Sequence, residues 1–481
     1  MSGPVFGRFS WPGHREMERL MRSPLGALAE QPWLDTVGIF ALRRWYFPLS
    51  RLWAAAGISD GLVTSFLDAA GIAPGRGTVA AAAQLALARY GAARRRLNAA
   101  TQAWDAAFFE GRGAGQPAEA LAHLDGERLA AAFAHVTTRA AFYPLWLLAD
   151  PPPVRWDIAP PAQLDAIHGA MREHPERAYG APAETPIAVS PPHRAAAGTR
   201  RWLRFASPSP RMGDFAFARV TEPPDAKDAP SVIVANGVCI EVDYVEGGLD
   251  VAGTLAGMGV RVIELVTPWH GRRTQPGWYG GEAFFGRAPL GAIDLFVAEV
   301  KEIAALVGWA RAQFGTPVGI AGFSLGALAS QLVATHCAHW PAALRPDALL
   351  LAAHSGRLEN VTFAGRLTVE LGLGDALTAS GWTRETLMGW LPLLNPGPAA
   401  GIDPARIVSV VGLADRITPA QDGVELCERW RIPAANRFVS NQCHFSKPVH
   451  LYRHRAPLER FHALLTGAAQ SNSSSRNDLR R

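Results

Sequence analysis

Residues 318–333 read VGIAGFSLGALASQLV and contain the pattern that decides the fold of this chain. An apolar run of strand length, 318–321, is followed by Gly-x-Ser-x-Gly centred on Ser324, and then by residues that favour a helix. A nucleophile elbow requires this context, because its glycines let the chain turn sharply and hold a strained serine above a sheet. The alternative is a glycine-eased turn with an idle serine.

Short β-branched or aliphatic runs surround this motif from residue 201 onward. From the third run on they alternate with segments of helical length, which is typical of a mainly parallel sheet with helices on both faces. A turn-rich stretch joins the first two runs, so an antiparallel hairpin is expected at the sheet edge. The eight expected strands are 202–205, 215–220, 232–235, 260–266, 318–321, 348–353, 407–412 and 437–440.

The first 149 residues have a different pattern, with apolar residues at helical spacing over 78–110 and a second helical stretch over 118–148. Ten of the 37 prolines lie between Pro151 and Pro192. We therefore expect four regions. They are a helical N-terminal domain (1–149), a Pro-rich linker (150–196), an α/β domain (197–466) and a disordered tail (467–481).

Composition excludes several classes of protein. Of the 481 residues 48% are hydrophobic and 19% charged, and the excess of Lys and Arg over Asp and Glu is only 47 − 42 = 5, so nucleic acid is not an expected partner. The four cysteines form no C-x-x-C pair. No secretory h-region and no window of 18 apolar residues is present, so a cytoplasmic protein without a membrane span is expected. The oligomeric state is not indicated.

Two residues after later strands can complete a catalytic site with Ser324. Asp415 follows the run 407–412, at the strand end where catalytic groups of such sheets collect, although it could instead cap the next helix. Glu359 is the alternative acid. His444 follows the last strand and precedes the last helix, where the general base is expected.

Three other histidines, His450, His454 and His462, fall within the expected last helix. His450 and His454 have the i, i+4 spacing of metal ligands, but Leu451 stands where an H-E-x-x-H motif has glutamate. No metal and no cofactor are therefore expected.

With the elbow, the acid and the base in this order, residues 201–465 resemble the α/β-hydrolase superfamily. The resemblance implies Ser324 as nucleophile, His444 as general base and Asp415 as its orienting acid. It also implies an oxyanion hole from the backbone N–H groups of Leu325 and Val238. The chain departs from the superfamily at Asn236, where members usually have histidine, and at Gln442-Cys443, where a glycine commonly precedes the base.

Two segments are candidates for the substrate pocket. The long loop 267–291 carries Trp269, Arg272 and Arg273, which could form an aromatic pocket with an arginine contact for an anionic group. Equally, its aromatic residues could pack on the N-terminal domain and its arginines pair with carboxylates. Residues 356–403 lie where a cap is usual and are rich in Leu and Trp.

These features predict a serine hydrolase that cleaves a small-molecule carboxylic ester through an acyl-serine intermediate. Two alternatives remain open. The same triad could transfer the acyl group to an alcohol or thiol, or the chain could be a binding or scaffold protein with a vestigial site.

Overall fold

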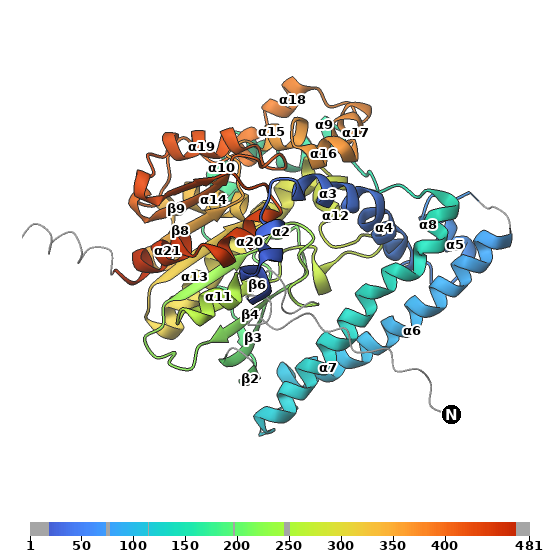
Figure 1. Cartoon of the computed structure of the whole chain (residues 1–481), viewed down its shortest axis with the longest axis horizontal. Helices are drawn as coiled ribbons and strands as arrows, with labels where there is room; N and C mark the ends of the chain where they lie inside the picture. Colours follow the sequence, from blue (N-terminus) through green and yellow to red (C-terminus); the bar gives the residue numbers. More distant parts are fainter. Residues whose placement is uncertain (1–18, 74–76, 114, 196–197, 245–250, 468–481) are drawn as a thin grey trace, which may run out of the picture.

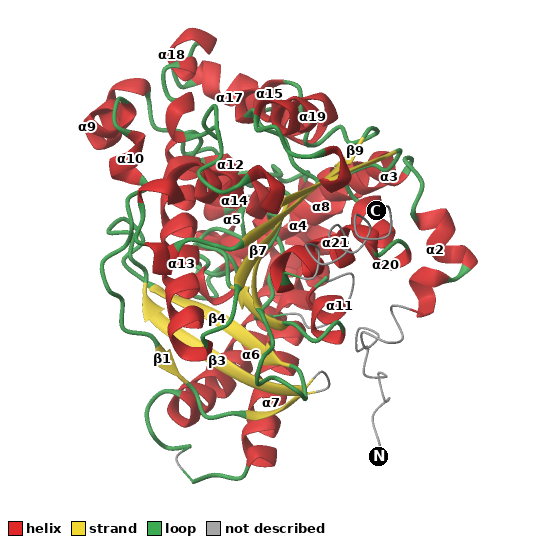
Figure 2. Cartoon of the chain, turned by 90° about the vertical axis from the view of Figure 1, so that its left-hand side faces the viewer, coloured by secondary structure: helices red, strands yellow, loops and turns green. Residues whose placement is uncertain are grey.

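A mixed sheet with helices on both faces forms the centre of the C-terminal part in the computed structural model (Figure 1). The structure describes residues 19–73, 77–113, 115–195, 198–244 and 251–467. Apart from Gly467, the tail expected over 467–481 lies outside these residues. Figure 2 shows the strands in yellow with helices packed around them.

The sheet contains all eight expected strands and two more, so it has ten strands rather than eight. Its order is β1-β3-β4-β6-β5-β7-β8-β9-β10, with β2 paired to β3. The pairs β1–β3, β2–β3, β3–β4 and β4–β6 are antiparallel, and the others are parallel. The bounds are β1 Ala188–Val189, β2 His193–Ala195, β3 Gly198–Ala206, β4 Phe215–Glu222, β5 Ser231–Ala235, β6 Arg261–Leu265, β7 Val318–Phe323, β8 Ala348–Ala352, β9 Ile407–Gly412 and β10 Arg437–Ser440.

Successive residues of the central strands enter different apolar clusters, because side chains alternate across a strand. Ile233 and Ile263 pack in the cluster that includes α13 (Leu290–Phe314), α14 (Leu325–His336) and α19 (Ala420–Arg429). Their neighbours Val232 and Val262 pack in the cluster of α11 (Ala252–Gly257), α20 (Ser446–Arg453) and α21 (Ala456–Thr466). Helices therefore cover both faces, as the sequence predicts.

The N-terminal region is helical, as predicted, and two long helices form a hairpin that projects beside the sheet (Figure 1). The stretch expected as one helix over 118–148 is interrupted by a 3₁₀ turn. The bounds are α2 Pro24–Ala29, α3 Leu34–Ala41, a π-helical turn η1 Leu42–Tyr46, α4 Phe47–Ala56, α5 Val63–Ala69, α6 Gly77–Phe108, α7 Ala118–Thr137, η2 Thr138–Phe142 and α8 Tyr143–Ala149.

These helices share an apolar core with the sheet. Ile39, Phe47 and Phe66 belong to the same cluster of buried residues as Ile233 and Ile320. A buried ion pair also joins the two regions, since Arg51 Nη1 lies 2.8 Å from Glu282 Oε2 and the two side chains are 2% and 0% exposed. The N-terminal helices are thus packed onto the α/β part rather than held apart from it.

The stretch expected as a linker, 150–196, instead contains α9 (Pro161–Arg172), α10 (Pro175–Ala178), β1 and β2. Proline is suited to the first helical position, where its missing N–H has no intrahelical partner to lose. The prolines of this stretch therefore include helix starts, and His168 of α9 lies 2.9 Å from Asp294 of α13.

The loop 267–291 and the segment 356–403 also contain short helices. They are η3 Gly271–Arg273, α12 Glu282–Gly286, α15 Leu358–Phe363, α16 Arg366–Leu371, α17 Leu373–Ala379, α18 Arg384–Met388 and η6 Leu391–Leu393. Four further 3₁₀ turns are η4 Cys337–His339, η5 Ala342–Leu344, η7 Pro404–Arg406 and η8 Ala434–Asn436. Among the residues described, no helix combines the length and apolar character needed to cross a bilayer.

Candidate active site

Ser324 stands in the turn between β7 and α14, with φ 54° and ψ −116°. Few non-glycine residues adopt a positive φ, and such strain is common at functional sites. Gly322 and Gly326 make the turn sterically feasible, because a Cβ at Gly326 would overlap the carbonyl of Ala235 and one at Gly322 would overlap the start of α14. The local geometry is that of the predicted nucleophile elbow.

The structure brings the three expected catalytic side chains together. Ser324 Oγ lies 3.0 Å from His444 Nε2, and His444 Nδ1 lies 2.8 Å from Asp415 Oδ2. Asp415 also accepts hydrogen bonds from the backbone N–H groups of Ile417 and Thr418 at 3.0 and 2.9 Å and from the Thr418 hydroxyl at 2.9 Å. Asp415 is therefore fixed in position by its own loop and can orient the imidazole.

The alternative acid, Glu359, lies in α15 and accepts a hydrogen bond from Asn395 Nδ2 at 2.7 Å. Asp415 is the carboxylate that contacts His444 Nδ1.

The charges around His444 favour its protonated form. Burial lowers the pKa of this histidine, but the nearby carboxylates of Asp415 and Asp35 outweigh burial and raise the pKa above its ordinary value, while Lys447 opposes them. Burial raises the pKa of Asp415, but the charge of His444 and the hydrogen bonds hold it below its ordinary value. A buried pair with these shifts stabilises the imidazolium that forms when His444 takes a proton.

The expected oxyanion loop lies against Ser324. A Cβ at Gly237 would lie 3.3 Å from Ser324 Cβ, and Gly326 N–H donates to the Asn236 carbonyl at 3.0 Å. Leu325 begins α14, so its N–H is among those without an intrahelical acceptor. Val238, the second expected donor, follows Gly237 directly.

His270 supports the same loop, a role that the sequence did not suggest. Its Nε2 accepts the backbone N–H of Cys239 at 2.9 Å, and its Nδ1 lies 2.9 Å from the Pro268 carbonyl. Burial lowers the pKa of His270 to about 4. The ring is therefore neutral at pH 7 and can accept the Cys239 hydrogen bond, which fixes the residue next to Val238.

Asp35 in the first turn of α3 is a second residue that the sequence did not suggest. Its carboxylate accepts the backbone N–H groups of His444 and Phe445 at 3.1 and 2.9 Å, and Asp35 is 3% exposed. The N-terminal helices therefore hold the loop that carries the candidate base.

The three expected substrate-binding residues contact other parts of the chain. Arg272 Nε lies 3.2 Å from Asp243, and its guanidinium stacks on Trp104. Arg273 is buried between Asp214 and Glu302, at 2.8 and 2.7 Å. Trp269 is 5% exposed and lines a polar cavity together with residues of α9 and α13. In this structure both guanidinium groups are engaged by carboxylates of the chain itself.

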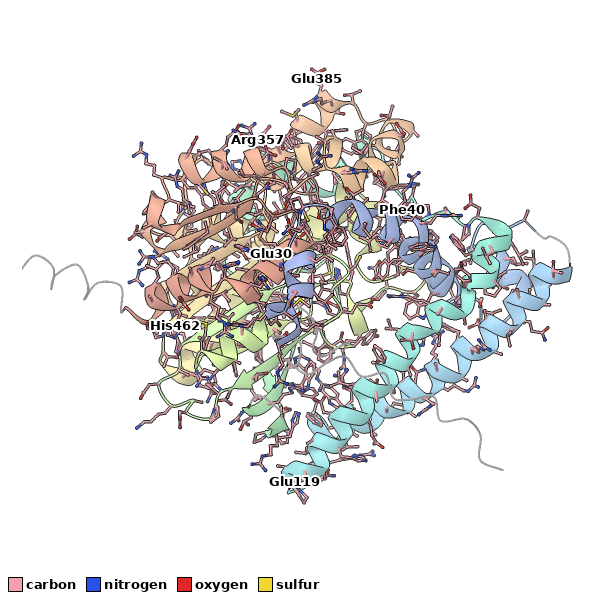
Figure 3. The ribbon with its side chains drawn as sticks, in the orientation of Figure 1. Glu30, Phe40, Glu119, Arg357, Glu385 and His462 are labelled. Atoms are coloured by element: carbon pink, nitrogen blue, oxygen red, sulfur yellow. The ribbon has the colours of Figure 1, made fainter. Side chains whose placement is uncertain are left out.

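His450 and His454 meet a carboxylate from the other end of the chain (Figure 3 labels Glu30). Glu30 Oε1 lies 2.5 Å from His450 Nδ1 and 3.2 Å from His454 Nε2, so these atoms could hold a metal ion. Arg453 Nε, however, lies 2.7 Å from Glu30 Oε2. Because Arg453 already pairs with this carboxylate, we interpret the group as an ion-pair cluster that connects α2 with α20 rather than as a metal site.

No family model matches the chain, and no curated protein matches its sequence. Among solved structures, a cold-adapted esterase from an Arctic intertidal metagenomic library is similar at 17% identity and a TM-score of 0.37, over 57% of this chain and 97% of that one. Acetyl xylan esterase 1 from Thermoanaerobacterium sp. JW/SL YS485 has 13% identity and a TM-score of 0.43, over 59% and 94% of the two chains. A prolyl endopeptidase has 12% identity and a TM-score of 0.38, over 59% and 45%.

The topology of this chain decides its fold class. The strand order β3-β4-β6-β5-β7-β8-β9-β10 places the elbow between β7 and α14, with one loop carrying Asp415 after β9 and another carrying His444 after β10. Serine, acid and histidine follow one another in this sequence order in α/β-hydrolases. The part of the chain from β3 to α21 therefore has the α/β-hydrolase fold.

Proposed function

We propose that this protein hydrolyses carboxylic esters through an acyl-Ser324 intermediate. The observation that carries the proposal is the continuous hydrogen-bonded chain from Ser324 through His444 to Asp415, set on a strained turn. These hydrogen bonds let the imidazole remove the serine proton at the moment of attack. Without such a base, a serine hydroxyl is protonated at neutral pH and is a weak nucleophile.

The reaction would proceed in two halves. Ser324 Oγ attacks the ester carbonyl carbon while its proton passes to His444 Nε2, and the carbonyl oxygen gains negative charge near the N–H groups of Leu325 and Val238. The carbon–oxygen bond to the alcohol then breaks as His444 returns the proton to the leaving oxygen. A water molecule then attacks the acyl carbon while His444 takes its proton, and the bond from this carbon to Ser324 Oγ breaks as His444 returns the proton to the serine, which releases the acid.

Labelling with a fluorophosphonate probe tests the nucleophile. We expect one labelled site at Ser324 and hydrolysis of simple nitrophenyl esters by the wild-type protein. Ser324→Ala should abolish labelling and lower kcat by about 10⁴ or more. Ser65→Ala, at an exposed serine of α5, is the matched control and should behave as wild type. A folded wild-type protein that is neither labelled nor active would favour the vestigial site.

Replacement of each candidate acid by its amide tests the assignment of Asp415. Asp415→Asn should be severely impaired, because the amide cannot hold the same tautomer or stabilise the imidazolium. Glu359→Gln should remain near wild type. The reverse pattern would assign the catalytic acid to Glu359 in α15. Product analysis with and without an added alcohol separates hydrolysis from acyl transfer.

A further inference from the structure

A hollow of about 510 Å³ is lined by N-terminal helices and by Phe445, the residue after the candidate base. We call it the N-terminal hollow. Six of its eight lining residues come from the segment Gly38–Leu49 of α3, η1 and α4, and Ala41, Leu42, Trp45 and Leu49 make its walls apolar. The volume is within the range of small-molecule sites.

Two lining residues connect this hollow to the candidate catalytic site. Phe445, which lines it, directly follows His444, and the close approach of Phe445 to α3 depends on Gly38, whose Cβ would lie 2.5 Å from the Phe445 ring. Arg139 lines another side and lies 3.2 Å from Glu241, three residues after Val238. The hollow is therefore lined by the residue after the candidate base and by an arginine that is paired with a residue shortly after the oxyanion loop.

The charged group of the lining already has partners within the chain. Arg139 donates to the Tyr46 hydroxyl at 3.2 Å as well as to Glu241, and Arg139 is 9% exposed. Since Glu241 balances the charge of Arg139, the site is not arranged for an anionic group, which would have to compete with that carboxylate. An uncharged apolar group fits it better.

The segment 356–403 offers a much smaller space. The cavity lined by its Leu373, Leu377 and Leu387 together with Phe284 and Phe285 has about 30 Å³, enough for about one water molecule. Of these two spaces, the N-terminal hollow is the one with room for an apolar chain.

The rim of the N-terminal hollow is also apolar. Trp45 contacts Phe40 edge to face, with ring centroids 5.5 Å apart, and the two residues are 41% and 57% exposed (Figure 3 labels Phe40 on α3). Exposed aromatic surface therefore adjoins the hollow.

We propose that the N-terminal hollow binds the acyl chain of the substrate, so that the preferred esters carry an uncharged acyl chain of medium or long length. The inference rests on the proposed esterase function. The acyl side is assigned because Arg139, which lines the hollow, donates a hydrogen bond to Glu241, three residues after the expected oxyanion donor Val238. The helical N-terminal region then supplies substrate specificity.

Nitrophenyl esters from acetate to dodecanoate test the proposal, because the leaving group stays constant. For the wild type, kcat/KM should rise up to about four-fold for each methylene group that becomes buried and then level off. Ala41→Phe fills the hollow and should lower the decanoate-to-acetate ratio of kcat/KM at least 10-fold. Ala80→Phe makes the same change at an exposed position of α6 and should leave the ratio unchanged.

Trp45→Ala removes part of the apolar wall of the hollow. Because Trp45 is half-exposed, this variant is expected to fold and provides the test if Ala41→Phe does not fold. It should lower the same ratio several-fold. A second series, acetate esters of longer alcohols, should show no comparable dependence on Ala41→Phe. If only this alcohol series responds, or if Ala41→Phe affects all chain lengths equally, the acyl assignment is overturned. Absence of hydrolysis of every ester by the wild type would instead overturn the proposed function itself.

Discussion

Replacement of Asp35 tests whether the N-terminal helices position the catalytic histidine. Asp35→Asn keeps the size of the side chain, but its amide can accept only one of the two backbone N–H groups that the carboxylate accepts now. A hydrogen bond to a charged group contributes about 1.5–3 kcal/mol. If this loss acts on the position of His444 in the transition state, kcat falls about 10- to 150-fold.

The pH profile separates this role from general destabilisation. Activity requires neutral His444, so kcat/KM rises as the pH increases through its pKa. Three charged side chains, Asp415, Asp35 and Lys447, act on this pKa, and Asp35 raises it. Asp35→Asn should therefore shift the rising limb to lower pH, with KM within about two-fold of wild type.

Steady-state kinetics on one nitrophenyl ester from pH 5 to 9, with thermal unfolding measured in parallel, provide the assay. Asp68→Asn, at an exposed aspartate of α5, is the control. A folded Asp35→Asn protein with wild-type kcat and an unmoved pH profile would refute the reasoning. Loss of kcat in strict proportion to loss of folded protein would assign Asp35 to stability alone.

Variants at three further residues probe other contacts around the site. His270→Leu removes the acceptor of the Cys239 N–H and should lower kcat about 10-fold with little change in KM. His270→Gln can still accept this hydrogen bond and should keep much more of the activity. Equal activity of the two variants would exclude a role of His270 in the oxyanion loop. Arg272→Gln should lower the Tm, because buried Asp243 loses the guanidinium that balances its charge, yet leave the kcat/KM ratio of acidic to neutral esters unchanged. A selective loss on acidic esters would instead assign Arg272 to substrate binding. Lys447→Met removes a cation that lowers the pKa of His444, so the rising limb of the pH profile should move to higher pH, and a shift to lower pH would contradict the assigned charges.

The residues that follow strand ends could be predicted from the sequence. Ser324 comes directly after β7, Asp415 and His444 follow β9 and β10 within about four residues, and the parallel arrangement of these strands brings their ends to one edge. Asp35 could not be found this way, because it lies 409 residues before His444 and resembles any acidic residue in a first helical turn. The pattern around Arg272 and Arg273 was equally compatible with substrate and with internal ion pairs, and only the tertiary structure identifies their partners.

The prolines between residues 151 and 192 suggested a break in the chain, because proline is depleted within helices and strands. At Pro161 and Pro175 they instead begin helices, and β1 and β2 extend the sheet by pairing with β3. A composition shift indicates a change of local structure, but it does not distinguish an extended linker from a segment that packs.

The apolar core shared by the N-terminal helices and the sheet has a consequence for how this chain can change. Removal of the helices would expose the sheet-side surface of that core and would leave Glu282 buried without Arg51. The α/β-hydrolase part of this protein is therefore not expected to be stable or active without the N-terminal helices. A recombinant in which another sequence replaces the first 149 residues must supply both the apolar surface that packs on the sheet and a group that replaces Asp35 at the loop of His444. These helices are consequently expected to diverge in step with the sheet they cover.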